Sequence, residues 1–230
     1  MAIGTGQVSL SDIQTEYGGS YPIQLSEYYS KGNAPASGEI RLWADFQGTS
    51  ADSHTLISSQ TASSSSSLSF TSGIDSTYDV YEWHFINMHP STFANFTFQV
   101  NAVGQTGFNE VITSAFFRAY QLESGGSSGV GYPTSYDQAQ GTAYQPISEG
   151  VHTNSDSSVS GVLTLFAPSS TTYVTHFLSR LNMMGASPVT VDMFCSGYIN
   201  TTSAIDEISF KFASGNIDAG EVRMYGVATS

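Results

Sequence analysis

Hydrophobic and polar residues alternate along several short stretches in the second, larger part of the chain. Because successive side chains of a strand point to opposite faces, this period of two predicts half-buried β-strands. The stretches with this pattern are residues 81–85, 95–100, 208–212 and 221–224. The side chains expected to face inward include Tyr81, Trp83, Phe85, Phe96, Phe98 and Val100.

Two further stretches, residues 161–166 and 173–177, are almost continuously apolar. Such runs are typical of central strands covered on both faces, and residues 168–171 predict the turn between them. No window keeps a period of 3.6 residues over the length of a long helix. The sequence therefore predicts a mainly β fold, with an antiparallel, jelly-roll-like β-sandwich over residues 49–230.

Residues 1–48 follow a different pattern, in which one short phrase occurs three times. The copies begin at Val8, Ile23 and Ile40, and each joins an apolar-x-Leu pair to a carboxylate and then a glycine. A copy this short cannot bury its own apolar side chains, so it must pack against a neighbour or a partner. We therefore expect residues 1–48 to form an attachment module.

Local signals in this module predict strand-like starts followed by helices of one or two turns. Ser11 with Asp12, and Ser26 with Glu27, match a capping hydroxyl followed by an acid in the first turn. The glycines after each copy predict helix ends, and residues 31–38 predict a loop. The side chains expected to make the attachment are Leu10, Ile13, Tyr17, Leu25, Tyr28, Leu42 and Phe46.

Residues 58–67 are rich in serine, which fits either a flexible linker or an ordered, polar edge of a sheet. Apolar residues lie on both sides, in 55–57 and in 68–70. They favour the ordered edge element, as part of a hairpin.

Residues 123–158 combine Gly, Ser, Tyr, Gln and Asn without regular aliphatic spacing, which predicts a long loop. Tyrosines set among glycine and serine are typical of recognition loops. An alternative is a meandering loop whose tyrosines pack on the sandwich, and both interpretations stay open. The candidate ligand-binding residues of this loop are Tyr132, Tyr136, Asp137, Gln140 and Tyr144.

Composition narrows the class of partner. Nineteen acidic and six basic residues leave a formal net charge of −13. So few Lys and Arg side chains cannot neutralise a run of phosphates, so we expect neither nucleic-acid binding nor attraction to anionic membranes. The chain has no apolar run approaching about 18 residues and no basic region followed by an apolar stretch, which predicts cytosolic synthesis without a cleaved signal.

The sequence offers no recognisable catalytic arrangement, so we do not expect an enzyme. Asp206 and Glu207 are adjacent and should point to opposite faces of a strand, unlike the facing carboxylates of glycosidases. His84 and His89 fit no zinc-binding spacing, and the single Cys195 is expected to be a small core residue. We therefore predict neither a metal site nor a cofactor.

Several stretches resemble bacteriophage proteins. The segment VSLSDIQTEYGGSYPIQLSEYY (8–29), followed by IRLWADFQG (40–48), is similar to an N-terminal module of virion structural and tail-fibre-like proteins of tailed phages. Residues 56–99, 166–180 and 197–227 resemble a domain common in structural proteins of cyanophages and other marine phages. In the third copy of the phrase, Trp43-Ala44 departs from the module by one inserted residue.

The resemblance implies a virion component made in the host cytoplasm. On this basis we expect a tail fibre or other surface appendage, attached through residues 1–48 to other virion proteins of the tail or capsid. The sandwich would display a surface that recognises a host glycan or protein. The resemblance also implies a homo-oligomer, with a trimer favoured. The alternative is an architectural protein, such as a capsid decoration, that binds no receptor.

Overall fold

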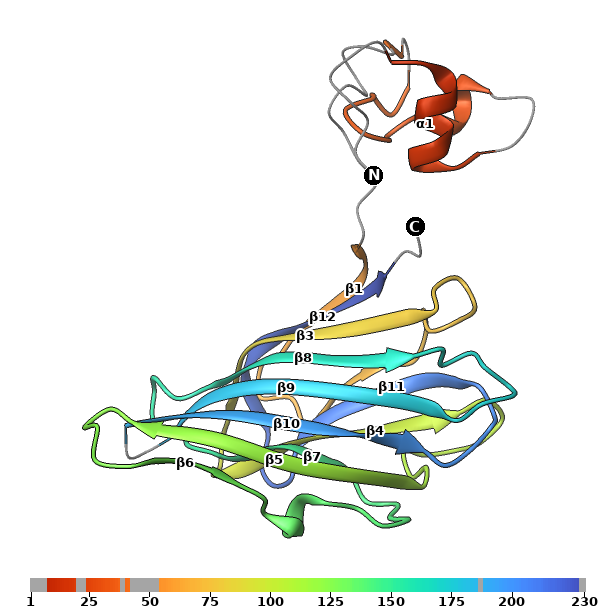
Figure 1. Ribbon diagram of the computed structural model, residues 1–230. Coiled ribbons are helices and arrows are strands. Elements are labelled where there is room, and N and C mark those ends of the chain that lie inside the picture. The colour runs from red at the N-terminus through yellow and green to blue at the C-terminus, as the bar shows by residue number, and fades with distance from the viewer. Residues whose placement is uncertain (1–7, 20–23, 38–39, 42–53, 186–187, 228–230) are drawn as a thin grey trace. The chain divides into compact units, whose positions relative to one another are not determined.

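A computed structural model describes residues 8–19, 24–37, 40–41, 54–185 and 188–227 (Figure 1). The chain forms two compact units that divide between Ser53 and His54. The sequence-based boundary at residue 48 lies outside the described residues, as do Leu42 and Phe46. None of the helices in the described part of the chain has the length and apolar character needed to cross a lipid bilayer.

The described elements are two short helices, then strands interrupted by one further helical turn. In chain order they are α1 (Leu10–Tyr17), η1 (Leu25–Tyr28), β1 (His54–Thr61), β2 (Leu68–Phe70), β3 (Val80–Pro90), β4 (Ala94–Ala102), β5 (Ile112–Leu122), β6 (Ser128–Gly131), η2 (Thr134–Tyr136), β7 (Gln145–Val151), β8 (Val159–Phe166), β9 (Thr175–Gly185), β10 (Val189–Ile199), β11 (Ile205–Phe212) and β12 (Ile217–Val227).

In the first unit, α1 begins with a capping box. The Ser9 hydroxyl accepts a hydrogen bond from the Asp12 amide at 3.2 Å, and the Asp12 carboxylate accepts one from the Ser9 amide at 2.8 Å. The predicted cap at Ser11 is therefore two residues too late, although Asp12 does lie in the first turn. The helix ends at Gly18, whose φ of 72° favours glycine. The second helix, η1, has no side-chain cap at all, so Ser26 does not cap it.

The three copies of the repeated phrase bury one another. Val8, Ile13, Tyr28 and Ala34 form a small core, against which Tyr17 and Ile40 pack. The copies therefore pack against their neighbours, which is one of the two alternatives that their length allows. Of the remaining predicted attachment residues, Leu10 is half-buried and Leu25 is 44% exposed. Val8 and Ile40 do not belong to a β-strand, although the backbone is extended at Ser9 and Gln24, and Ile23 lies outside the described residues.

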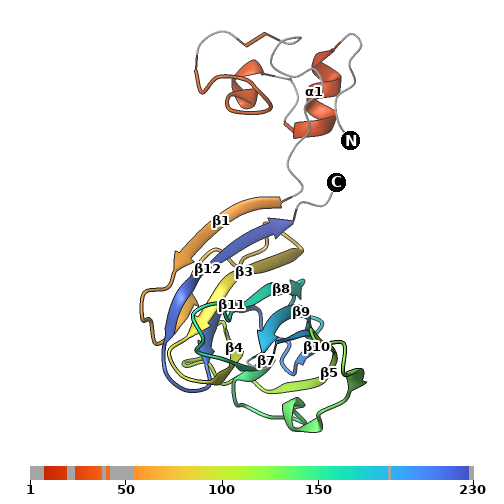
Figure 2. The same ribbon diagram turned by 90° about the vertical axis from the view of Figure 1, so that its left-hand side faces the viewer.

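The second unit is an antiparallel β-sandwich, as the sequence predicts. The larger sheet has the strand order β1-β12-β3-β8-β9-β10-β5-β6, and the smaller has the order β2-β11-β4-β7. Figure 1 looks onto the larger sheet with the smaller one behind it, and Figure 2 shows the layers from the side. Every neighbouring pair of strands runs antiparallel.

Aromatic side chains fill the space between the sheets. The expected inward residues are all buried, and Phe85 packs edge-on against both Phe96 and Phe210 at centroid distances of 5.1 and 5.0 Å. Rings in this arrangement contribute about 1 kcal/mol beyond their buried area. The alternating pattern therefore identifies the core correctly.

The prediction that β8 and β9 are covered on both faces is wrong. Each strand alternates buried and more exposed residues, and Phe166 and Leu178 on the outer face are 37% and 53% exposed. The strand buried on both faces is β4, where the polar Gln99 is fully buried beside Phe98 and Val100. A continuous apolar run in the sequence therefore does not distinguish a strand buried on both faces from a strand whose outer face is apolar but exposed.

The serine-rich segment is ordered and lies at sheet edges. β1 is the edge strand of the larger sheet, and β2 is the edge strand of the smaller one. They do not form the expected hairpin, because β1 pairs with β12 and β2 pairs with β11. Polar edges of this kind oppose edge-to-edge aggregation.

Candidate functional site

Residues 123–158 are structured, so the predicted long loop is wrong. They contain β6, η2 and β7, while residues 123–127, 132–133, 137–144 and 152–158 are irregular. The strand β7 escapes a sequence pattern because it is short and contains Pro146, Ser148 and Gly150. Its place at the edge of the smaller sheet tolerates the proline.

Two fully buried glutamines pin this segment to the sandwich. The Gln99 side-chain amide on β4 donates to the carbonyl oxygens of Glu110, Thr142 and Ala143 at 2.9, 3.1 and 3.1 Å. Its own oxygen accepts the Val100 amide at 2.8 Å. One side chain therefore satisfies backbone groups from three places in the chain.

Gln145 on β7 is the second such residue. Its amide nitrogen donates to the carbonyl oxygens of Tyr136 and Pro146 at 2.9 and 2.8 Å, and its oxygen accepts the Ser114 hydroxyl at 2.6 Å. The same hydroxyl accepts the backbone amide of Gln138 at 3.0 Å. These bonds fix η2 and the residues after it against β5.

Three of the five predicted ligand-binding residues are neighbours. Tyr132 is 59% exposed and donates its hydroxyl to the Asp137 carboxylate at 2.7 Å, which raises the pKa of that hydroxyl. The other Asp137 oxygen accepts the Phe116 amide at 2.7 Å. Tyr136 packs against the core and contacts the Phe116 ring at a centroid distance of 5.0 Å. Asp137 therefore positions this turn.

The other two predicted residues hold the segment in place elsewhere. The Gln140 side chain donates to the Thr113 hydroxyl at 2.9 Å and accepts from Asn200 at 2.7 Å. The Tyr144 ring lies 4.0 Å from the Lys211 ammonium group. The structure thus combines the two earlier interpretations, because some tyrosines pack down and Tyr132 is displayed.

Beside Tyr136 lies an open groove of about 670 Å³, a volume typical of small-ligand sites. It forms where the edge strand β7 stops covering the inner face of the larger sheet, over β5, β9 and β10. Its floor is apolar and its walls are aromatic and polar. The lining residues are Phe93, Arg118, Tyr120, Pro133, Ser135, Tyr136, Glu149, Gly150, His152, Met183, Gly185, Val189 and Val191.

One wall of the groove carries an exposed, fixed aromatic ring. Phe93, in the turn between β3 and β4, is 56% exposed. A Cβ added at Gly150 would lie 2.2 Å from the Phe93 ring, so the ring rests directly on the glycine backbone of β7. The His152 ring lies beside it at a centroid distance of 4.5 Å. The glycine and the histidine together hold the ring in place.

An ion pair also lines the groove. The Arg118 guanidinium on β5 donates to the Glu149 carboxylate on β7, and these two side chains are 34% and 12% exposed. The guanidinium also lies over the Tyr120 ring, 5.6 Å from its centroid. Burial, and secondarily the charge of Glu149, raises the pKa of Tyr136. At neutral pH the tyrosine therefore keeps its proton as a hydrogen-bond donor.

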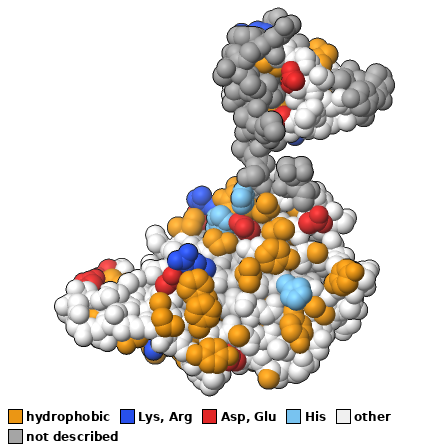
Figure 3. All heavy atoms as spheres, in the orientation of Figure 1, with side chains coloured by type: hydrophobic (Ala, Val, Ile, Leu, Met, Phe, Trp, Pro, Cys, Tyr) orange, Lys and Arg blue, Asp and Glu red, His pale blue; other side chains and the backbone are white. Residues whose placement is uncertain are grey.

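A second surface lies on the outer face of the larger sheet, where hydrophobic side chains gather (Figure 3). The strand register places Val162, Arg180, Phe194 and Phe117 in one row across four strands. The rings of Phe117 and Phe194 stack at 4.8 Å, and the Arg180 guanidinium lies 5.1 Å from the centre of Phe194. We refer to this row, with the exposed Leu178 and Phe166, as the outer apolar face.

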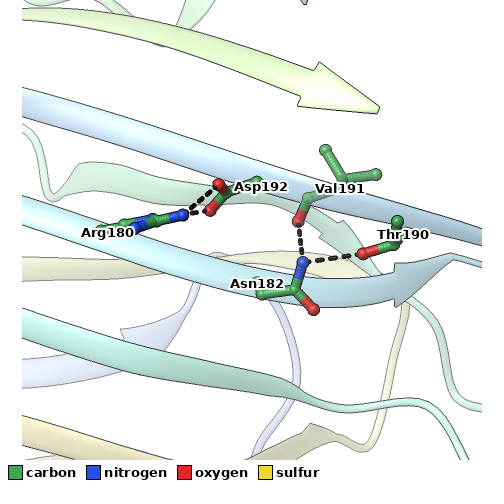
Figure 4. Close-up of polar contacts among 5 residues, drawn as sticks. All are labelled: Arg180, Asn182, Thr190, Val191 and Asp192. Atoms are coloured by element: carbon green, nitrogen blue, oxygen red, sulfur yellow. Dashed lines mark hydrogen bonds and ion pairs between the residues drawn. The ribbon is translucent and has the colours of Figure 1, made fainter. Parts of the chain in front are cut away.

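Polar side chains of β9 and β10 form hydrogen bonds beside this row (Figure 4). Arg180 donates to both oxygens of Asp192 at 3.2 and 2.8 Å, and Asn182 donates to the Thr190 hydroxyl and the Val191 carbonyl at 2.8 and 3.2 Å. Arg180 is 69% exposed, so solvent screens this pair and it adds little to stability. Its main effect is to hold the guanidinium over Phe194.

Cys195, His84 and His89 are the residues for which the sequence predicts neither catalysis nor metal binding. Cys195 is 3% exposed, and burial raises the pKa of its thiol to about 12. His84 contacts Glu82 at 2.9 Å on the outer face of β3, while His89 contacts the Ser157 carbonyl at 2.7 Å. In the ranges that the structure describes, no three His, Cys, Asp or Glu side chains converge as metal ligands.

The sequence did not reveal the main groove residues, since Phe93, Arg118 and the pair Glu149 and His152 come from three separate places in the chain. One weak signal was available. Phe93 lies in a Ser-Thr-Phe turn between two predicted strands, where a large apolar residue is unexpected.

The chain matches no protein-family model, no curated protein and no solved structure.

Proposed function

We propose that this chain is a bacteriophage virion structural protein, a tail fibre or another surface appendage. It attaches to tail or capsid proteins through residues 1–48 and displays the β-sandwich for host-surface recognition. Two features support the proposal: the resemblance of residues 8–29 and 40–48 to phage modules, and the division of the chain into two compact units.

The observation that carries the recognition role is the groove beside Tyr136. Its lining includes a half-exposed phenylalanine and an ion pair, and buried glutamines fix the neighbouring turn. A site prepared in this way loses little conformational entropy when it binds. We assign the groove to binding and assign no catalytic step to this chain.

Many copies on one particle make weak binding sufficient. If the chain assembles as a homotrimer, as we propose, neighbouring grooves engage one cell surface together, and the avidity exceeds that of a single groove by orders of magnitude.

The test uses particles of the phage that encodes this chain. Mass spectrometry of purified virions should detect the chain, and antibodies against it should reduce adsorption to host cells. Detection without any effect on adsorption would refute host recognition. Absence from purified virions would refute the whole proposal.

The outer apolar face favours a second candidate function, an architectural protein without receptor binding. Phe117 and Leu178 are 45% and 53% exposed there, and apolar patches often mark protein contacts. This candidate predicts that a virion neighbour covers these two residues in a reconstruction of the particle. It also predicts that the groove beside Tyr136 faces another virion protein, whereas host recognition requires the groove to face solvent.

A further inference from the structure

We infer that the groove beside Tyr136 binds an uncharged, hydroxyl-rich glycan chain, with Phe93 as the stacking platform and the Arg118–Glu149 pair as the hydrogen-bonding wall. This inference rests on the proposed function, because it names the ligand class of the same site.

The first step concerns Phe93. Because its ring rests on Gly150 and beside His152, it is held in place while 56% of the residue stays exposed. Exposing an aromatic side chain costs free energy in water, and nothing in the core requires this ring at the rim. A fixed, exposed ring is suited to the apolar C–H face of a sugar, which stacks on aromatic rings.

The second step concerns the ion pair. The hydrogen bonds of the described structure use one N–H of Arg118, toward Glu149, while a guanidinium carries five. The side chain is 34% exposed, so further N–H groups lie within reach of the groove. The Tyr136 hydroxyl lies in the same lining and keeps its proton at neutral pH. Donors beside a carboxylate acceptor match vicinal hydroxyl groups, each of which donates and accepts.

The third step concerns charge. Glu149 compensates the positive charge of Arg118, so the groove has no free cation to attract an anionic group. The chain as a whole carries −13, which repels an acidic polymer. Charge therefore favours an uncharged glycan over an acidic polysaccharide.

The fourth step concerns size. Stable recognition of a folded protein buries about 800 Å² on each partner around a well-packed apolar centre. The groove instead offers one exposed ring and an open volume of about 670 Å³. These dimensions suit a few linked sugar units.

The experiment measures binding of the full-length chain to immobilised polysaccharides. The probes are uncharged dextran, mannan, galactan and β-glucan, with alginate and polysialic acid as acidic counterparts. We expect at least one uncharged polymer to bind and both acidic ones to fail. Phe93→Ala should weaken binding at least about fivefold through loss of the stacked ring.

Two further variants separate the groove from a general loss of folding. Gly150→Ala places a methyl group where the Phe93 ring lies, so it should weaken binding as much as Phe93→Ala without removing any polar group. Tyr173→Ala, at a 76% exposed aromatic residue outside the groove lining, should leave affinity within about twofold.

Binding to the acidic polymers alone, binding that both groove variants leave unchanged, or binding to none of the probes would overturn the ligand class. A chain that is present in virions and whose antibodies block adsorption, yet binds no glycan, keeps the proposed function and loses this inference. Glycan binding at the groove by a chain absent from virions would support this inference and refute the proposed function.

Discussion

The buried amide of Gln145 offers the sharpest test of how the groove is built. We consider Gln145→Leu, which keeps a similar volume and removes the polar atoms. The substitution removes the donor to the Tyr136 and Pro146 carbonyls and the acceptor for the Ser114 hydroxyl. The Ser114 oxygen still accepts the Gln138 amide, but its hydroxyl proton loses its acceptor while the two carbonyls lose this donor.

The magnitude follows from these contacts. A buried carbonyl without a donor costs about 1–3 kcal/mol, and the extra apolar surface of leucine returns about 1 kcal/mol. Two such carbonyls cost about 2–6 kcal/mol, so the free energy of unfolding of the sandwich should fall by about 1–5 kcal/mol. Because Tyr136 and the groove wall depend on the same bonds, amide hydrogen exchange should accelerate most in residues 134–143.

Urea unfolding and hydrogen exchange of the full-length protein measure both effects. The matched control is Gln138→Leu in the same segment. Its side chain donates at 3.0 Å to the Ala143 carbonyl, which also accepts from Gln99, so that carbonyl keeps a donor and the loss should stay below about 0.5 kcal/mol. Equal losses for the two variants, or unchanged exchange in residues 134–143 of Gln145→Leu, would refute this reasoning.

Three other substitutions or reactions test the account. Asp206 has a buried Oδ1 without a hydrogen-bond partner. Burial, and secondarily the charge of Glu207, raises the pKa of its carboxyl group, so the free energy of unfolding falls as pH rises through that pKa. Asp206→Asn should thus raise the melting temperature at pH 7, and the gain should disappear below pH ~3, where both side chains are neutral. The Cys195 thiol, with its pKa raised to about 12, should react with a disulfide reagent at pH 8 at least about 100-fold more slowly than in denaturant; a comparable rate would contradict its burial. Ser9→Ala should destabilise α1 by about 1 kcal/mol, seen as faster exchange of its first-turn amides, and unchanged exchange would show that the capping box contributes nothing.

The fold could largely be predicted from the sequence because one physical signal dominates it. Alternation placed Phe96, Phe98 and Val100 in the core, and all three are fully buried. The same reasoning failed for β8 and β9, because an exposed outer face that is itself apolar looks like a buried one. Sequence alone does not record which face a second layer covers.

The candidate site was less accessible for a topological reason. Of the five residues predicted from the composition of residues 123–158, only Tyr136 lines the groove. Phe93 rests on β7 of the smaller sheet and Arg118 lies on β5 of the larger one, so only the packing of the two sheets brings them to one groove.

The buried glutamines explain why the segment looked like a loop. Gln99 and Gln145 supply by hydrogen bonding the order that aliphatic spacing would otherwise reveal. The sequence does not show whether a glutamine is buried, so it gives no sign that hydrogen bonds order this segment.

Competition for host cells tests the central claim most directly. Host cells are incubated with purified full-length chain, either wild-type or Phe93→Ala, before the phage is added, and free phage is counted. We predict that the wild-type chain reduces adsorption and that Phe93→Ala, folded to the same thermal stability, reduces it far less. Equal inhibition by both chains, or no inhibition by the wild-type chain, would contradict recognition of the host through this groove.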